Sequence, residues 1–480
     1  MPSDSATPAA VASIRPMREQ RSRPRSITPP PAAGPAFPHV PAIFTFLFCL
    51  YVVQWYTEFG IRSPFLGAIR FEFLLGSLLV VIAALFHAPR PEGRRPSTPI
   101  GIACLYGAML LSFVFTVDFH LSWTIFVDRV VKFSMMALFI ATFVRAPGHL
   151  RVFYGSVFLA WLRIGQVAFR GQITGGLVWE SQGIMRLHGE GGSRLAHPNS
   201  LAGFGVGNLP YIYALVPVVG WVARGFLLLQ LLFVTNIIIF TGSRTGYVAV
   251  FAVAIAVYFR SRARKQYLLW ATIAVAISVF LVPQQYRERF STIFSGQERE
   301  GSSRETRIQI LVDAVTVFKE NPLGVGVGGF PVVRERRFGR TQDTHNLYLE
   351  VLTNLGIQGG IAFLVFLSTL FADLRFATRR TLEQLKRVTR LQTLTATRAE
   401  QEALETTRRD LELMRASCVG TSLFLVARLA LGMFGMDLYE IYWWFASGQV
   451  IAVFEMTKIT GAWLEHLEAR SAAAPPRSES

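Results

Sequence analysis

Charged residues and cysteines are both scarce in this sequence. Of its 480 residues only 16% are charged, whereas 51% are hydrophobic. The apolar residues come in blocks of about 18 to 25, the length that crosses a bilayer as a helix, so a single soluble domain is excluded. Cys49, Cys104 and Cys418 all lie inside apolar blocks, and the sequence has no CxxC pair or Cys/His cluster. Structural disulfides and a metal site are therefore not expected.

Basic residues outnumber acidic ones, with 48 Lys and Arg against 31 Asp and Glu and a net charge of +17. In a soluble chain this excess would point to nucleic acid. In a membrane protein, basic loops report orientation instead. We therefore expect membrane lipids, and no nucleic acid, as partners.

The apolar blocks predict an all-α polytopic membrane protein with about twelve transmembrane helices. An even number of spans puts both termini on one side, and arginines cluster in the tail and in alternate loops near residues 90–95, 145–151 and 260–265. The positive-inside rule makes that side cytoplasmic. The predicted spans are 41–60, 65–87, 99–117, 121–144, 150–168, 199–217, 225–241, 243–260, 267–283, 345–371, 417–436 and 440–460.

The segments between and beyond the spans complete the expected organisation. The first forty residues, rich in Pro, Ala, Ser and Arg, predict a disordered tail because they offer little apolar surface to bury. The charged segment 373–416 predicts an amphipathic helix or hairpin, either a solvated extension of the spans or a docking surface. The expected divisions are a cytoplasmic tail 1–40, a membrane domain 41–372 with outward segments 169–198 and 284–344, a cytoplasmic helical segment 373–416, two last spans 417–460 and a cytoplasmic tail 461–480.

Polar motifs gather at outward ends of the predicted spans. His345 and Asn346 open the tenth span, and His345, Leu349 and Gly356 share one face at helical spacing, which predicts His345 in the first helical turn. A histidine at the outer end of a span has a pKa near working pH, which suits a general base. The alternative is a capping or interfacial histidine without a chemical role.

Two further motifs also begin spans from the outside. In the segment 241–247, Ser243 and Arg244 combine a helix start with a guanidinium group, a pairing that favours phosphate. The alternative is an arginine that snorkels at the interface. In the segment 194–202, Arg194 precedes a helix start at His197, Pro198 or Asn199. Three such helix ends, if they converge, would form a site for a diphosphate.

The outward segment 284–344 carries the fourth motif. Arg304 and Arg307 precede an amphipathic stretch that leads to the glycine-rich segment 321–330. This segment matches GxGxxG literally, but it follows Asn-Pro and no βαβ unit surrounds it, which argues against a dinucleotide site. A glycine-rich turn between two loop helices fits better.

Taken together, these residues resemble the superfamily of O-antigen ligases and Wzy-type O-antigen polymerases. The resemblance runs from about Arg186 to Gly360 and rests on Ser243–Gly246, His197–Asn199, Arg307 with the segment 321–326, and His345–Asn346 followed by Leu349 and Gly356. It departs from the family pattern at Leu311, where relatives often carry tryptophan, and in the length of 373–416.

The resemblance implies a GT-C-like glycosyltransferase of the bacterial inner membrane. Such enzymes move a glycan from undecaprenyl diphosphate to a hydroxyl of an acceptor glycan or of lipid A-core on the periplasmic side, with no metal and no cofactor. It further implies that His345 activates the acceptor and that Arg244 and Arg307 bind the diphosphate. Arg304, Arg194 and Arg186 are additional donor candidates, and Ser243, Asn346, His197 and Asn199 are expected to support the site.

Other functions remain open at this stage. A ligase, a polymerase of surface polysaccharide and a protein O-glycosylating ligase share these motifs and differ in the acceptor. A transporter or flippase for lipid-linked glycans would place charged residues at mid-span or repeat its two halves, and neither pattern is seen. A non-catalytic scaffold would not depend on His345, Arg244 or Arg307.

Overall fold

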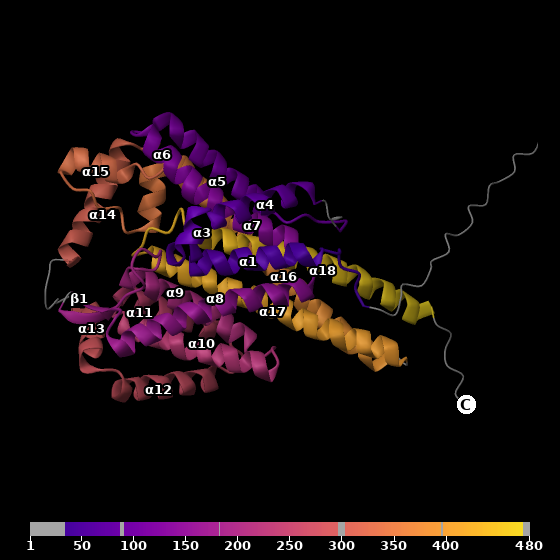
Figure 1. Cartoon of the computed structure of the whole chain (residues 1–480). Coiled ribbons are helices and arrows are strands. Elements are labelled where there is room, and N and C mark those ends of the chain that lie inside the picture. Colours follow the sequence, from indigo (N-terminus) through magenta and orange to yellow (C-terminus); the bar gives the residue numbers. More distant parts are fainter. Residues whose placement is uncertain (1–33, 87–90, 182, 296–302, 395–396, 474–480) are drawn as a thin grey trace, which may run out of the picture.

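The computed structural model describes residues 34–86, 91–181, 183–295, 303–394 and 397–473. Within these ranges the protein is almost entirely α-helical, as predicted (Figure 1). The exception is a short antiparallel hairpin of β1 (Val178–Ser181) and β2 (Ile184–Leu187), which the sequence did not predict. Most of the predicted disordered tail, residues 1–33, lies outside the described ranges.

Each of the twelve apolar blocks coincides with one or more helices. Five described helices have a segment apolar and long enough to cross a membrane: Thr98–Phe115, Pro147–Thr174, Trp221–Phe240, Leu347–Leu394 and Arg398–Gly432. In chain order the helices over the blocks are α1 (Ala42–Thr57), α3 (Pro64–Ala68) with α4 (Phe71–Leu85), α5 (Thr98–Ser112), α6 (Phe119–Ile125) with α7 (Lys132–Phe143), α8 (Pro147–Thr174), α9 (Pro198–Leu215), α10 (Trp221–Phe240), α11 (Arg244–Arg260), α12 (Arg264–Leu281), α16 (Leu347–Leu394), α17 (Arg398–Gly432) and α18 (Ile441–Ala473).

Several of the predicted spans are not continuous α-helices. The short helix α2 (Phe59–Arg62) follows α1, and Arg70 separates α3 from α4 in the left-handed conformation with φ of 50°. The fourth block is interrupted by a π-helix, η2 (Phe126–Val131), while the 3-10 turn η1 (Phe113–Phe115) ends the third. A π-turn inserts an extra residue and rotates the side chains that follow it, which is a frequent feature of functional sites.

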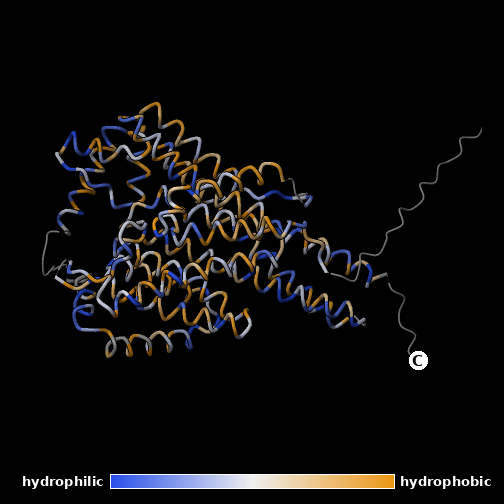
Figure 2. Tube along the Cα trace, in the orientation of Figure 1, coloured by the Kyte–Doolittle hydropathy of each residue, from blue (hydrophilic) through white to orange (hydrophobic). Residues whose placement is uncertain are grey.

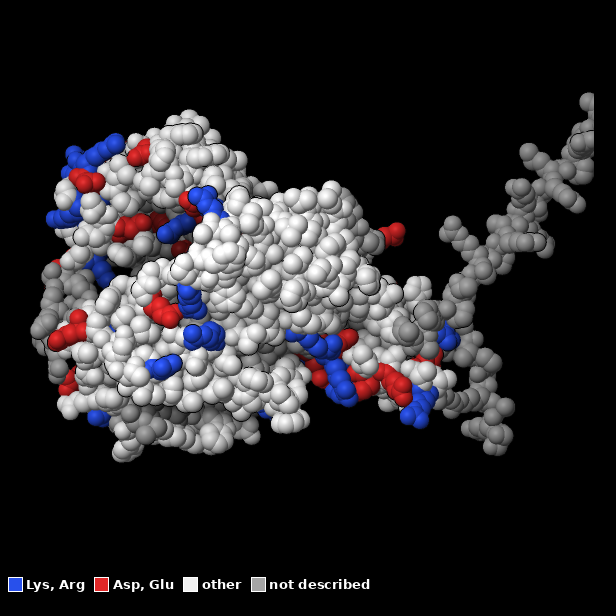
Figure 3. Space-filling model, viewed as in Figure 1, with Lys and Arg blue, Asp and Glu red and all other residues white. Residues whose placement is uncertain are grey.

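The helices form a bundle with different structures at its two ends (Figure 1). One end carries the β-hairpin together with α13 (Gln284–Ser295), α14 (Ser303–Glu320) and α15 (Phe330–Phe338), so the predicted outward loop 284–344 is largely helical. Hydrophobic residues dominate the helices between the ends (Figure 2). Charged side chains gather at the ends, and the surface between them is mostly uncharged in this view, as expected for a band in contact with lipid (Figure 3).

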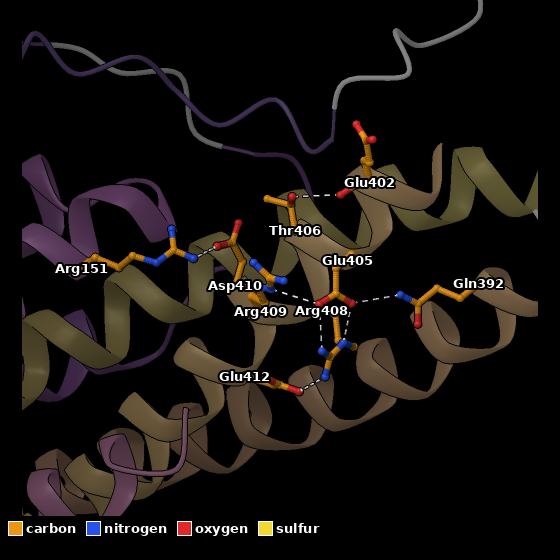
Figure 4. A network of polar contacts seen from close by, with 9 residues as sticks. All are labelled: Arg151, Gln392, Glu402, Glu405, Thr406, Arg408, Arg409, Asp410 and Glu412. Carbon is orange, nitrogen blue, oxygen red and sulfur yellow. Dashed lines mark hydrogen bonds and ion pairs between the residues drawn. The ribbon is translucent and has the colours of Figure 1, made fainter. Parts of the chain in front are cut away.

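The opposite end is an extension of α16, α17 and α18 beyond the bundle (Figure 1). The predicted helical segment 373–416 is indeed a hairpin, formed by the end of α16 and the start of α17. Figure 4 shows the ion pairs along it: Glu405 accepts from Arg408 at 2.9 Å and from Arg409 at 3.0 Å, and Arg151 of α8 pairs with Asp410. These ion pairs lie within α17 or join it to α8, whereas between the two helices of the hairpin Gln392 Nε2 donates to Glu405 at 3.4 Å.

The glycine-rich segment 321–329 connects α14 to α15, as predicted, and lies against a break in α16. Gly356 has φ of 73° inside α16, and the amides of Val325 and Gly326 donate to the carbonyls of Thr353 and Asn354 at 3.0 Å each. A Cβ on Gly356 would lie 2.3 Å from the Leu323 carbonyl carbon. Gly356 therefore makes room for a loop rather than for a second helix.

The expected position of His345 in the first turn of this helix is wrong. Helix α16 begins at Leu347, and the Asn346 side chain caps it by accepting from the amides of Tyr348 and Leu349 at 3.0 Å each. His345 precedes this cap in a left-handed conformation with φ of 47°. The capping preference of asparagine explains why the helix starts later than the apolar periodicity predicts.

Candidate functional site

The starts of α9 and α11 meet at the side chain of Asn199. Its Oδ1 accepts hydrogen bonds from Ser243 Oγ at 3.0 Å and from Arg186 Nη2 at 2.9 Å. Ser243 caps α11 by accepting from the Gly246 amide, and a Cβ on Gly246 would lie 3.1 Å from Ala202 Cβ of α9. Two helix N-termini, each with a positive dipole end, are thus brought side by side.

Arg186 reaches this junction from the β-hairpin. It lies on β2, is buried, and its Nε donates to the Thr241 carbonyl at 2.7 Å. The hairpin is held in place from α13, where the Tyr286 hydroxyl donates to the Met185 carbonyl at 2.7 Å. The unpredicted hairpin therefore has a clear role, which is to carry one arginine to the place where two helices begin.

Three arginines from three other elements act electrostatically on Arg186, and we call the four the arginine cluster: Arg186 (β2), Arg244 (α11), Arg289 (α13) and Arg307 (α14). Burial and the positive charges of Arg289, Arg244 and Arg307 together lower the pKa of Arg186 to about 10. Mutually repelling guanidinium groups in a partly buried place form a site that favours an anion. A phosphate or diphosphate fits them because each guanidinium can donate two parallel hydrogen bonds.

His345 is placed beside the arginine cluster by the loop that precedes α16. Arg334 of α15 is fully buried, and its Nε donates to Asp313 of α14 at 2.9 Å. Its Nη1 donates to the Gln342 carbonyl at 3.2 Å, which fixes the chain three residues before His345. At the other side Asn346 Nδ2 donates to the Met433 carbonyl at 3.0 Å. A left-handed histidine held at both sides is typical of a functional site.

The imidazole of His345 is adapted to act as a base. Partial burial lowers its pKa, the nearby carboxylate of Asp343 raises it, and Arg307 and Arg334 lower it again. The net direction is downward, so the ring is neutral at neutral pH and has a free nitrogen lone pair. The influence of Arg307 also places His345 within electrostatic reach of the arginine cluster.

His197 lies between these groups. Its Nδ1 accepts from the Asn199 amide at 3.1 Å, so it caps α9 as an unprotonated nitrogen. Burial lowers its pKa, and so do Arg186, His345 and Arg307. His197 is therefore a structural neighbour of all three, and the cap accounts for the His-Pro-Asn helix start.

The site opens into a cavity of about 1250 Å³. His197, Asn199, Thr245 and His345 are among its lining residues, so the three helix starts singled out in the sequence do face a common space. Other lining residues come from α1, α4, η2, α7 and the segment before α18. A volume of this order exceeds the ~300–1,000 Å³ of a site for a drug-sized ligand.

The remaining donor candidates lie elsewhere or cannot be placed. Arg194 is exposed at the cavity, stacks on Trp55 at 4.5 Å from its centroid and pairs with Glu58 at 3.5 Å and Glu72 at 3.3 Å. It is not among the arginines that act on Arg186. The backbone of Arg304 lies in the first turn of α14, and its side chain is outside the described part.

Sequence reasoning missed three residues of this region. Arg289 lies in the outward segment 284–344 among several other arginines, and Asp343 was not singled out although it lies two residues before His345. Arg428 stands alone in an apolar block, a signal that could have been used because a charge within a span is costly. It is buried on α17, donates from Nη2 to the Gly203 carbonyl at 3.0 Å and lines the cavity.

No metal-binding cluster of three or more His, Cys, Asp or Glu occurs among the described residues. The arginine cluster supplies cationic groups that can neutralise a phosphate here. This arrangement suits displacement of a phosphorylated leaving group, in which negative charge develops next to fixed donors.

The comparison with known proteins agrees with this geometry. Residues 228–364 match the model of the O-antigen ligase family, a range that includes Arg244, Arg289, Arg307 and His345 but not Arg186 or Arg428. No curated protein matches the chain. The similarity is confined to residues 228–364, and the family that it indicates is one of polytopic membrane enzymes of the glycan ligase and polymerase type.

Proposed function

We propose that this protein is a periplasm-facing glycosyltransferase that moves a glycan from undecaprenyl diphosphate to an acceptor hydroxyl, as an O-antigen ligase or a polymerase of surface polysaccharide. The observation that carries the proposal is His345, a histidine of lowered pKa that lines a large cavity and lies within electrostatic reach of Arg307 of the arginine cluster. A diphosphate leaving group requires positive groups that neutralise its charge, and an attacking hydroxyl requires a base that takes its proton.

The reaction is a single displacement. The acceptor oxygen attacks the anomeric carbon while the bond from that carbon to the diphosphate oxygen breaks, and undecaprenyl diphosphate leaves with the electron pair. His345 takes the hydroxyl proton and later releases it to water. The configuration at the anomeric carbon inverts. A covalent glycosyl-enzyme or a product of retained configuration would contradict this course.

We assign the individual roles as follows. Arg244, Arg307, Arg186 and Arg289 bind the diphosphate, and Arg304 remains a donor candidate from the sequence whose side chain lies outside the described part. Ser243, Asn199 and His197 hold the helix starts, and Asn346 holds the turn that presents His345. Arg194, with its charge already balanced by Glu58 and Glu72, belongs to the cavity wall rather than to the diphosphate site. The reaction requires no metal or cofactor in this scheme.

The orientation in the membrane is part of the proposal. We assign twelve spans in a GT-C-like arrangement in the bacterial inner membrane, with both termini and the extension of α16, α17 and α18 in the cytoplasm. The β-hairpin, α13, α14 and α15 then face the periplasm. The domain limits given above, with tails at 1–40 and 461–480, follow from this orientation, although α18 remains helical as far as Ala473.

The test is a deletion strain scored by its surface polysaccharide on a gel. Loss of long chains on lipid A-core, with accumulation of lipid-linked polymer, identifies a ligase, and single-repeat chains identify a polymerase. Unchanged lipid-linked glycans with loss of glycan from a protein identify a protein O-glycosylating ligase. Complementation with His345→Ala, Arg244→Ala and Arg307→Ala should fail, and full rescue by all three variants would refute the enzymatic proposal.

A further inference from the structure

Helix α14 carries a second apolar face that its own packing does not use. Its first apolar face is buried, where Ala314 and Val317 pack with Val325 and Phe330 in a small core shared with the glycine-rich segment and α15. Four large aliphatic residues on another side form what we call the α14 stripe: Ile308, Leu311, Val312 and Val315. None of these four belongs to a hydrophobic cluster of the described residues.

The α14 stripe has the spacing and the exposure of a helix surface that meets lipid. Its members follow one another at i, i+3, i+4 and i+7, so they lie on one face over two turns. Ile308 is 51% exposed and Val312 is 54% exposed, which equals exposed positions of the spans such as Leu228 of α10 at 50%. A helix face that met only water would carry polar side chains at these positions.

The chain that follows α14 leads to an exposed apolar side of α16. Leu323, three residues beyond the end of α14, is 48% exposed, and its carbonyl accepts from Gln358 Nε2 at 2.7 Å. The neighbouring Ile357, whose amide donates to the Pro322 carbonyl at 2.9 Å, begins a row of exposed apolar residues that continues with Ile361. Because α16 is long and apolar enough to cross a membrane, the end of α14 is fixed beside a surface that faces lipid.

Basic side chains accompany this surface. Lys319 is exposed in the last turn of α14, and Arg336 is exposed in the last turn of α15. Lys and Arg side chains are also visible at this end of the molecule in Figure 3. An apolar face with such neighbours suits a membrane surface, because the aliphatic side chains can enter the acyl boundary while the cations reach phosphate headgroups.

On these grounds we infer that the α14 stripe is seated in the outer leaflet of the membrane, against the acyl chains just below the headgroups. Helix α14 is then an interfacial helix rather than part of a loop in the open periplasm. The contact with lipid does not depend on the reaction, whereas the choice of leaflet rests on the proposed orientation. Arg307 precedes Ile308 and is one turn from Leu311, so the same contact holds this arginine near the depth of lipid phosphates. This last consequence rests on the proposed function.

The test uses the full-length protein, with its native cysteines replaced by serine, in liposomes of phosphatidylethanolamine and phosphatidylglycerol. An environment-sensitive fluorophore is attached through Val312→Cys in the stripe or through Thr306→Cys, an exposed position on the opposite side of α14. The label at position 312 should be quenched by phospholipids that carry a nitroxide near the headgroup and be protected from iodide, because interfacial helices bury their apolar face about 5–10 Å deep. The label at position 306 should be quenched by iodide.

Four results would overturn the inference. Quenching by iodide at position 312 would place the stripe in water, and protection from both quenchers would show that the protein itself covers it. Energy transfer between labelled copies, without quenching by the nitroxide lipids, would make the stripe an interface with a second copy of the chain. An emission change that requires undecaprenyl phosphate in the liposomes would make it a site for the polyprenyl chain.

Polar substitutions test the consequence for Arg307. Ile308→Gln with Val312→Gln should lower transfer from a donor embedded in liposomes at least about tenfold, because small displacements of a charged group at a reacting centre are costly. Transfer from a short-chain donor that is soluble in water should fall much less, and Thr306→Gln is the control that should leave both rates unchanged. Equal losses with both donors would refute the effect of depth on Arg307. Absence of transfer by the wild type with either donor would count against the proposed function and leave the fluorescence result as it stands.

Discussion

At the scale of single residues, the chemistry depends on a histidine that is neutral and on arginines that are crowded. Burial and Arg307 lower the pKa of His345, while Asp343 raises it. A base works only in its deprotonated form, so its activity is present above its pKa and is lost as the pH falls through it. Under the proposed mechanism, Asp343 therefore raises the lower pH limit of activity through its effect on the pKa of His345.

We predict that Asp343→Asn extends activity to lower pH. Removing the carboxylate removes the influence that raises the pKa of His345, so the acidic limb of the pH profile of kcat/KM moves downward. Thr341→Ala, in the same loop, is a control that should leave this limb in place. If the acidic limb of the profile does not move in Asp343→Asn, a group other than His345 is responsible for it.

A second residue-scale prediction concerns Arg289, the member of the arginine cluster that acts most strongly on Arg186. Arg289→Gln should lower kcat/KM by on the order of 10²-fold, because one fixed donor to the leaving group is lost. Arg287→Gln, an exposed arginine on the same helix, should change it by less than about twofold. Equal effects of the two substitutions would indicate a general loss of charge rather than a site.

These residues also show how much of the candidate site could be predicted from the sequence. Ser243, His197 and Asn346 were predicted at helix starts because capping is a local property that residue type reveals. Arg186 was only a secondary candidate, and Arg289 was missed, because each owes its place to tertiary contacts of the hairpin and of α13. The left-handed backbone of His345 had no sequence signal, since histidine is not a residue that such a conformation requires.

At the scale of elements, the glycine-rich segment and the break in α16 form one unit. The amide of Ile357 donates to the Pro322 carbonyl at 2.9 Å, and Phe330 N donates to Asn354 Oδ1 at 3.0 Å. The sequence predicted the turn correctly but read Gly356 as a residue on a continuous helix face. Periodicity could not reveal the break because apolar residues keep their spacing on both sides of it.

Gly356→Ala should therefore destabilise the protein by at least about 2 kcal/mol, since it combines a positive φ with a Cβ that overlaps backbone atoms. Gly360→Ala, on the same helix, meets only the tip of the Leu352 side chain at 3.1 Å and should cost less than about 1 kcal/mol. Thermal unfolding of both variants in one detergent is the measurement. Equal melting temperatures would contradict this account of the break.

The ion pairs of the helical hairpin should contribute much less to stability than Gly356 does. Hydrogen bonds from Arg408 and Arg409 lower the pKa of Glu405 to about 2, but these side chains are partly exposed to solvent. We predict that Arg408→Gln changes stability by less than about 1 kcal/mol and leaves transfer activity intact. Thermal unfolding at low and high salt, together with the transfer assay, checks this. A large loss of transfer activity in Arg408→Gln would contradict this prediction and would indicate that the hairpin has a function of its own.

At the scale of the whole molecule, the account requires the reactive end to lie outside the cytoplasm. In a variant whose native cysteines are replaced by serine, Glu335→Cys on α15 should react with a membrane-impermeant thiol reagent in intact spheroplasts. Arg398→Cys at the tip of the hairpin, where the side chain is 92% exposed, should react only after lysis. The opposite pattern would place the site in the cytoplasm and refute the orientation.

The general architecture was accessible from sequence because block length and loop charge are strong signals for a membrane protein. All twelve apolar blocks coincide with helices, yet the interruptions at Arg70 and in η2 were not predicted. Both occur inside apolar blocks but at charged residues, Arg70 in the first and Asp128 and Arg129 in the second, a signal that block length alone does not use. The cavity was equally hidden, because its walls come from elements far apart in the chain.

The most direct test of the central claim is single-turnover transfer by the purified protein, comparing the wild type with His345→Gln at saturating donor. Our account predicts that the variant still binds the undecaprenyl-diphosphate glycan through the arginine cluster but transfers it at least about 10²-fold more slowly. Transfer by the variant at the wild-type rate, with donor binding unchanged, would contradict the account.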